Sequence, residues 1–253
     1  MPRVFEQLAD WQTERTAMEA AGGTVGFVPT MGALHAGHRS LLQRARAEND
    51  RVVLSIFVNP TQFDDPEDLT RYPRTLEADL QVADGLADCV LVPAAGELYP
   101  DQYRYRVTEY SFSTWGEGAH RPGHFEGMLT VVLKLLNLVR PHRAYFGEKD
   151  WQQLRLVQGM VRAFCLPVEI VGCPTLREAD GLALSSRNRL LSVAARAQAA
   201  AFPRLLRESP DAAAAAGALR TAGFEVDYIE EREGVRLGAV RLGGVRLIDN
   251  VRL

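Results

Sequence analysis

Two histidines three residues apart, His35 and His38, lie in a glycine-containing segment that follows a short apolar stretch. The segment reads Pro29-Thr30-Met31-Gly32-Ala33-Leu34-His35-Ala36-Gly37-His38. Its glycines allow close backbone approach, and the free N–H groups and positive end of a helix beginning here favour an anion. The segment therefore predicts a phosphate site, although it is neither a Walker A loop nor a G-x-G-x-x-G motif. A metal site lacks an evident third ligand, and a structural histidine pair is the remaining alternative.

Lysine is rare in this sequence. The 29 basic residues divide into 27 Arg and two Lys, Lys134 and Lys149. Lys134 interrupts an apolar stretch, where its aliphatic stem can cover hydrophobic surface. Lys149 follows a predicted strand and stands between Glu148 and Asp150, with which it could form an ordinary surface ion pair. The imbalance raises the question of what arginine could not do at position 149.

Strand-like and helical stretches alternate over residues 24–171 and must position these groups. The run at residues 52–58 is β-branched and nearly continuous, as is typical of a strand buried on both faces of a parallel sheet. Predicted strands are 24–28, 52–58, 89–92, 144–146 and 168–171, and predicted helices are 37–48, 75–85, 125–139 and 151–164. This order predicts an α/β fold, a Rossmann-like doubly wound parallel sheet with ligands at the carboxyl ends of its strands.

The sequence changes character near residue 173, where we place a domain boundary. Residues 1–172 are predicted to form the Rossmann-like domain and residues 173–253 a smaller C-terminal α+β domain. Ala-rich stretches at 194–201 and 212–218 predict helices, and alternating segments follow from residue 224. Val-Arg-Leu recurs at 235–237, 240–242 and 245–247. Short strands with arginine on the solvent side are favoured here over an Arg-rich nucleic-acid surface.

Composition limits the class of protein. With 253 residues, 47% hydrophobic content and a net charge of −3, the chain can bury a core and has no general electrostatic reason to bind nucleic acid or an anionic membrane. Three widely spaced cysteines, Cys89, Cys165 and Cys173, suggest small core residues of a reduced compartment. No signal peptide or membrane span is evident. A cytoplasmic protein is expected.

Two motifs in the same order point to a family. The His-x-Gly-His segment resembles the HIGH signature of the nucleotidyltransferase superfamily, and Leu184-Ser185-Ser186-Arg187-Asn188 stands where that superfamily has a KMSKS-like loop. Together with further segments, the chain resembles the pantothenate synthetase (pantoate–β-alanine ligase) family over nearly its whole length. Those segments are Asn59–Phe63, Arg71–Arg74, Arg121–Phe125, Gly147–Gln153, Asp180–Ala183 and Arg246–Asn250.

The resemblance implies a two-step ligation. ATP and pantoate would form an enzyme-held pantoyl adenylate and release pyrophosphate, after which the amine of β-alanine would attack the acyl carbon and AMP would leave. Stabilisation by position and charge should then dominate over covalent chemistry. Mg²⁺ is expected with ATP rather than on a protein metal site. A homodimer with a C-terminal lid domain is also implied.

The resemblance also assigns residues. His35, His38, Lys149 and Arg187 would be catalytic, with His38 a candidate proton donor, and the compact ammonium of Lys149 would suit phosphate oxygens. Gln62 and Gln153 would hold pantoate. Asn59 and Arg121 match substrate-site motifs with less defined roles. The implied ATP-binding residues are Met31, Gly32, Ala33, Leu34, His35, Ala36, Gly37, His38, Gly147, Glu148, Lys149, Asp150, Leu176, Leu184, Ser185, Ser186 and Arg187.

Three departures and three alternatives accompany this assignment. Ser-Ser-Arg replaces Lys-Met-Ser-Lys-Ser, Glu126 stands where Arg is frequent, and the C-terminal unit looks shorter than usual. One alternative is another nucleotidyltransferase, for instance one that adenylylates a mononucleotide. A second is a nucleotide-sensing binding protein, which would not need a complete set of transition-state donors. An aminoacyl-tRNA synthetase would need an anticodon-binding domain, and none is evident.

Overall fold

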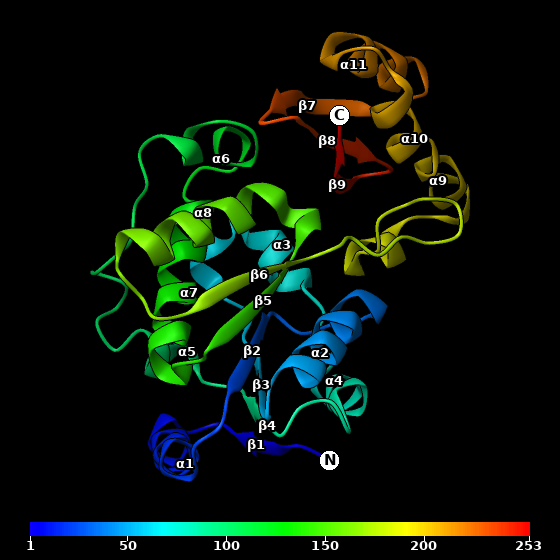
Figure 1. The fold of residues 1–253 in the computed structure, drawn as a ribbon. Helices are drawn as coiled ribbons and strands as arrows, with labels where there is room; N and C mark the ends of the chain where they lie inside the picture. The colour runs from blue at the N-terminus through cyan, green and yellow to red at the C-terminus, as the bar shows by residue number, and fades with distance from the viewer.

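The structure is a computed structural model that describes residues 1–253 and contains two sheets (Figure 1). The larger sheet has six parallel strands in the order β1-β4-β3-β2-β5-β6. The smaller sheet is antiparallel, in the order β7-β8-β9. The strands are β1 Arg3–Phe5, β2 Val25–Thr30, β3 Arg51–Ile56, β4 Cys89–Leu91, β5 Arg143–Gly147, β6 Glu169–Cys173, β7 Glu225–Arg232, β8 Val235–Leu242 and β9 Val245–Arg252.

Helices cover both faces of the larger sheet, because successive strand residues point to opposite faces. On one face Phe27 and Val53 pack with residues of α1, α7 and α8, and on the other Val28 and Leu54 pack with residues of α2 and α4. The helices before β6 are α1 Leu8–Ala21, α2 Ala36–Glu48, α3 Pro66–Arg71, α4 Leu76–Ala83, α5 Ala95–Leu98, α6 Glu117–His120, α7 His124–Val139 and α8 Trp151–Ala163.

The predicted doubly wound α/β sheet is confirmed. β2 pairs with β3 on one side and with β5 on the other, so the strand order reverses between β2 and β5. Every predicted strand and helix of residues 24–171 is present with ends that differ by no more than two residues. The sequence analysis missed β1, α1 and the short helices α3, α5 and α6. The buried positions of α1 do have helical spacing, but Arg15 stands between Trp11 and Met18, and its Nε donates to the carbonyl of Val139 at 2.6 Å.

Residues after Cys173 form three helices and the smaller sheet, which lie beyond one edge of the larger sheet (Figure 1). Phe202 and Leu206 of α10 pack on residues of β8 and β9. A domain boundary near residue 173 stays a prediction. The helices are α9 Val193–Ala199, α10 Ala201–Glu208 and α11 Ala212–Thr221.

The prediction that the tail arginines face solvent is wrong for Arg236 and Arg246. The repeats are five residues apart, and an odd separation within one strand points side chains to opposite faces. Arg236, only 1% exposed, donates to the carbonyls of Leu206 and Ser209 at the end of α10. Arg241 stays half exposed and lies directly across from Arg246, whose side chain is 16% exposed. All three pair with carboxylates, which leaves little free positive charge for nucleic acid.

Two further expectations concern the cysteines and the membrane. Cys89 and Cys173 are buried, as predicted, but Cys165 is exposed, and all three are free thiols. Burial raises the pKa of the Cys89 thiol to about 12, which makes it unreactive. None of the helices has the length and apolar character needed to cross a membrane.

Candidate active site

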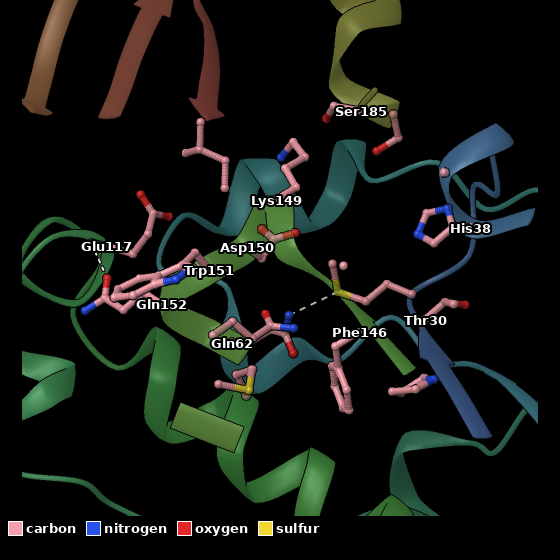
Figure 2. A pocket seen from close by; sticks show the side chains of 18 of the residues that line it. Thr30, His38, Gln62, Glu117, Phe146, Lys149, Asp150, Trp151, Gln152 and Ser185 are labelled. Carbon is pink, nitrogen blue, oxygen red and sulfur yellow. Dashed lines mark hydrogen bonds between the residues drawn. The ribbon is translucent and has the colours of Figure 1, made fainter. Parts of the chain in front are cut away.

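A cavity of about 270 Å³ opens at the carboxyl edge of the larger sheet. β2 runs into the histidine segment and β5 into Gly147–Asp150, so the two segments start from neighbouring strands at the point where the strand order reverses. Open α/β sheets bind ligands at this place. β3 and β6, the outer neighbours, lead to Asn59–Gln62 and to Leu176. In Figure 2, His38 and Ser185 lie at one end of the cavity, Glu117 and Gln152 at the other, and Gln62 and Lys149 between them.

The backbone N–H groups of residues 32–34 are not free, which corrects the sequence analysis for this part of the histidine segment. Ala33 and Leu34 donate to the carboxylate of Asp79 at 3.0 and 2.7 Å. The N–H of Gly32 donates to Thr30 Oγ1 at 3.2 Å. Gly32, Ala33, Leu34 and Ala36 do not line the cavity. The main chain of residues 32–34 therefore offers no free N–H donor to a ligand in the cavity.

Backbone N–H groups of the histidine segment hold both imidazole rings. His35 Nδ1 accepts from the N–H of Gly37 at 3.1 Å, and His38 Nδ1 accepts from the N–H of His35 at 3.3 Å. A neutral imidazole whose Nδ1 accepts has its proton on Nε2. Both rings line the cavity, and no protein group accepts from either Nε2. Each histidine is thus a pre-set N–H donor.

The charge state of these rings follows from their surroundings. Burial, followed by the charge of Lys149, lowers the pKa of His35 to about 4. Burial, followed by the charges of His35 and Lys149, lowers the pKa of His38 to about 3. Both rings are therefore neutral at pH 7 in the unliganded protein. This favours hydrogen-bond donation by His38 over the donation of a proton from a resting imidazolium.

Lys149 forms no ion pair, although Glu148 and Asp150 flank it. The interpretation of Lys149 as part of a surface ion pair is therefore wrong: its side chain is half-buried and lines the cavity. Its backbone is fixed from the smaller sheet, because Asn250 Nδ2 donates to the carbonyls of Glu148 and Lys149 at 2.8 and 2.9 Å. Lys134, by contrast, lies 3.5 Å from Asp101 and over the ring of Tyr99.

The Leu184–Arg187 loop borders the same cavity, together with Leu176. Leu184 donates to the carbonyl of Leu176 at 2.9 Å, and Ser185 Oγ accepts from the N–H of Arg187 at 3.2 Å. The guanidinium of Arg187 forms an ion pair: its Nη2 lies 2.8 Å from Asp68 Oδ2 on α3. The loop is thereby joined to α3, outside the cavity lining.

Amide side chains form a second polar group in the cavity. Gln62 Nε2 donates to Met31 Sδ at 3.2 Å, the contact drawn in Figure 2, and Gln62 Oε1 accepts from Asn59 at 3.0 Å. Asn59 is 1% exposed, and its amide also bonds Gly127, Thr61 and Tyr99. Asn59 therefore orients Gln62 and has no bond left for a substrate. Gln153 lines the cavity and has no hydrogen-bond partner in the protein.

Arg121 and Glu117 close the far end of the cavity. Arg121 Nε lies 3.0 Å from Asp64 Oδ1, and its Nη1 donates to Nε2 of the buried His124 at 3.2 Å. His124 Nδ1 then donates to the carbonyl of Gln62 at 2.8 Å. Burial, together with the charge of Arg121, lowers the pKa of His124 to about 4, so the ring is neutral. Sequence analysis treated His124 as mainly structural and overlooked this link to Gln62.

Glu117 of α6 joins this end of the cavity to the smaller sheet. Its carboxylate accepts from Arg246 at 2.6 and 2.8 Å and from the hydroxyl of Tyr228 at 3.1 Å. Burial alone would raise the pKa of Glu117, but the hydrogen bonds and charge of Arg246 hold that pKa at about 2. Arg246 also lies 2.7 Å from Asp227 of β7. The wall of the cavity that contains Glu117 is thus fixed by β9.

The residues that line the cavity differ in part from those expected from the sequence. Glu148 does not line the cavity, and Glu126 accepts hydrogen bonds from Arg106 and Thr108 away from it. Tyr72 does line it, and burial raises the pKa of its hydroxyl. Tyr72 belongs to the Arg71–Arg74 segment of the family resemblance, so the sequence did contain a signal for it. Glu117 and Asp79 had none, because their partners lie far away in the sequence.

The fold and the cavity have the features of the nucleotidyltransferase superfamily: a doubly wound sheet with a His-x-Gly-His segment and a Ser-Ser-Arg loop at its point of strand reversal. The sequence model described as Pantoate-beta-alanine ligase matches residues 3–252. The chain belongs to the pantoate–β-alanine ligase family.

Individual relatives support this family assignment. A pantothenate synthetase of Bdellovibrio bacteriovorus is 52% identical over 254 residues, with all of both chains covered. One from Legionella pneumophila strain Lens is 48% identical over 99% of this chain and 100% of its own. The C-terminal unit is therefore not short compared with these two relatives, contrary to the sequence-based expectation.

Solved structures support the same family assignment. A pantoate–β-alanine ligase of Francisella tularensis, complexed with β,γ-ATP and β-alanine, has a TM-score of 0.94 and 38% identity, covering 100% of this chain and 98% of its own. A pantothenate synthetase of Thermus thermophilus has a TM-score of 0.88 and 43% identity, with 99% of each chain covered.

Proposed function

We propose that the protein joins pantoate to β-alanine in an ATP-dependent reaction that proceeds through pantoyl adenylate and releases pyrophosphate and AMP. The observation that supports this best is the unpaired ammonium of Lys149 beside two neutral imidazoles whose free Nε2–H groups line one cavity. These donors form a cluster suited to phosphate oxygens. Gln62 and Gln153 supply neutral donors and acceptors in the same cavity, as pantoate's hydroxyls and carboxylate require.

In the first step a pantoate carboxylate oxygen attacks the α-phosphorus of ATP, and the bond from that phosphorus to the α,β-bridging oxygen breaks to release pyrophosphate. Both reactants are anions, so the step needs donors placed where charge develops. His35, His38 and Lys149 line the cavity and would supply these donors without covalent chemistry. Arg187 joins them once it leaves Asp68.

In the second step the amine of β-alanine attacks the acyl carbon, the carbon–oxygen bond to the phosphate breaks, and AMP leaves. The amine loses a proton to solvent as the amide forms. Holding the two reactants in one cavity replaces a bimolecular encounter by an oriented one. The half-buried Arg121 at the far end is a candidate partner for a substrate carboxylate.

Mg²⁺ is proposed as the companion of ATP. No group of three or more His, Cys, Asp or Glu side chains is arranged to hold a metal ion. This fits an ion that phosphate oxygens and water bind, with few protein ligands. When bound, it would neutralise phosphate charge. A homodimer and a cytoplasmic location stay predictions, the first of which analytical ultracentrifugation would test.

The proposed reaction is tested by measuring pantoate-dependent exchange of labelled pyrophosphate into ATP, first without β-alanine. Exchange should require pantoate, and adding β-alanine should yield AMP and pantothenate in equal amounts. A dinucleotide product would support the mononucleotide adenylylation alternative. ATP binding without any pyrophosphate release would reject the enzyme and favour a sensor.

Gln62→Ala should weaken the binding of pantoate. Loss of a hydrogen bond to a charged group costs about 1.5–3 kcal/mol, so we expect KM for pantoate to rise about 10- to 100-fold while KM for ATP changes less than about twofold. Steady-state kinetics with each substrate varied in turn would measure this. Gln43→Ala, on the exposed side of α2, is the control. An unchanged KM for pantoate would remove Gln62 from the pantoate site.

Asp68→Asn should release Arg187 from its ion pair. Asp68 and Arg187 are each about one-third exposed, and exposed pairs are worth about 0.2–1 kcal/mol. The apparent KM for ATP should therefore fall about 1.5- to 5-fold, because ATP no longer competes with Asp68 for the guanidinium. Glu67→Gln, which affects only the neighbouring pair with Arg71, is the control. A rise in KM for ATP would show that Asp68 assists nucleotide binding.

A further inference from the structure

Asp79 is a buried carboxylate without a cation. It lies on α4, is 2% exposed and forms no ion pair. Burying an unpaired charge is costly unless hydrogen bonds replace the lost water. Here they do: Asp79 accepts from the N–H groups of Ala33 and Leu34 at 3.0 and 2.7 Å and from Thr75 Oγ1 at 3.2 Å.

The loop that donates to Asp79 has an unusual backbone. Gly32 and Ala33 both have positive φ, +83° and +51°. A Cβ at Gly32 would lie 2.9 Å from Asp79 Oδ2 and 3.1 Å from Ile56, so only glycine fits. Successive N–H groups in such a turn form a concave anion-binding nest. In this protein the anion in the nest is the carboxylate of Asp79.

This arrangement determines where the histidines lie. The N–H of Leu34 is held by Asp79, and the next residue, His35, is the N-cap of α2. His38 follows one helical turn later. The N–H groups of Gly32, Ala33 and Leu34 are already satisfied, so the main chain of these three residues does not offer donors to a phosphate. The direction of the two Nε2–H groups then depends on the loop that Asp79 holds.

We propose that Asp79 is a positioning residue for adenylate formation, acting through residues 32–35 on His35 and His38. The proposal rests on the proposed function, since it assumes that these histidines contact ATP. It assigns Asp79 no contact with substrate. Its effect should therefore appear in the ATP step and not in pantoate binding.

The variant that tests this is Asp79→Asn, which keeps the shape but turns one acceptor oxygen into an NH₂ group facing N–H donors. A displacement of about 1 Å can cost about 100-fold in rate. We expect pantoate-dependent pyrophosphate exchange to fall about 100-fold, with KM for ATP raised and KM for pantoate within about twofold of wild type. Glu77→Gln, exposed on the same helix, should leave all three unchanged.

Wild-type exchange kinetics in folded Asp79→Asn would overturn the proposal. So would an equal loss in the ATP and pantoate parameters together with a lower melting temperature, since that is a merely structural effect. If Asp79→Asn does not fold, Thr75→Val removes only the hydroxyl donor and should raise KM for ATP about threefold, as expected for one neutral hydrogen bond. No change in Thr75→Val would then count against the proposal.

A readout independent of activity separates this proposal from the proposed function. In wild type the amide protons of Ala33 and Leu34 should exchange slowly with solvent, and in Asp79→Asn they should exchange at least about tenfold faster while amides of β2 do not change. Wild-type protein that shows protected amides but no pyrophosphate exchange would sink the proposed function alone. Unprotected amides in active wild-type protein would sink the role of Asp79 alone.

Discussion

Lys149→Ala is expected to lower pantoate-dependent pyrophosphate exchange by about 100- to 1,000-fold, the usual cost of removing one preorganised donor to developing charge. The physical reason is that Lys149 has no carboxylate partner, so its full charge is available to phosphate oxygens. The melting temperature should stay within about 2 °C of wild type, since no ion pair is broken. Rapid-quench measurement of pyrophosphate release would give the rate of the chemical step.

Lys134→Ala is the matched control for Lys149→Ala. It removes the other lysine of the chain, whose ammonium lies near Asp101 and Tyr99 rather than in the cavity. Its exchange rate should be unchanged.

Lys149→Arg tests whether charge alone suffices. The planar guanidinium is larger and cannot place a compact ammonium among the Nε2–H groups of His35 and His38, so we expect a loss of at least about tenfold. Turnover equal to wild type would show that lysine at this position has no special role. Loss in Lys134→Ala as large as in Lys149→Ala would indicate a general effect on the fold.

Arg246→Met is expected to destabilise the protein by about 3–5 kcal/mol, because it leaves the buried carboxylate of Glu117 without its main partner. Glu117 and Arg246 side chains are 10% and 16% exposed, so water can replace only part of the lost bonds. Urea unfolding at pH 7 would measure the change in the free energy of unfolding. Arg241→Met, at the directly opposite and half-exposed position, should cost less than about 1 kcal/mol.

The pH dependence of unfolding gives this prediction a second test. The pKa of Glu117 is lowered from an ordinary value of 4.5 to about 2. The native state therefore binds fewer protons than the unfolded state between these values, so the stabilisation is fully present above pH 4.5 and is lost as pH falls towards 2. Glu117→Gln should flatten that part of the pH profile. An unchanged profile would mean that Glu117 does not titrate as its surroundings require.

Local patterns were enough to predict the parallel sheet and the edge at which the cavity lies. The apolar runs at β3 and β5 and the helical spacing of α2 and α7 define a βαβ order that has few topologies. That order then brings the histidine segment and Lys149 to neighbouring strands. The roles of individual residues came from the family resemblance rather than from spacing.

Long-range side-chain partners were not predictable from the sequence. Asp79 lies 45 residues from Leu34, and Arg246 lies 129 residues from Glu117, so no periodicity connects them. The repeated arginines were misinterpreted for a related reason. Asp227 is the extra residue of a β-bulge in β7, and from there it contacts both Arg241 and Arg246. A pattern of alternation does not reveal a bulge, which re-aims side chains locally.

The two hydrogen bonds from Asn250 to the carbonyls of Glu148 and Lys149 span 102 and 101 residues of sequence. During synthesis on the ribosome, the strands of the larger sheet emerge well before β9 does. A nascent chain that has made Lys149 therefore still lacks the contacts that fix its backbone, and it gains them only when the last strand has been translated and has paired with β8. The order of translation thus delays the completed lysine segment until the smaller sheet has folded.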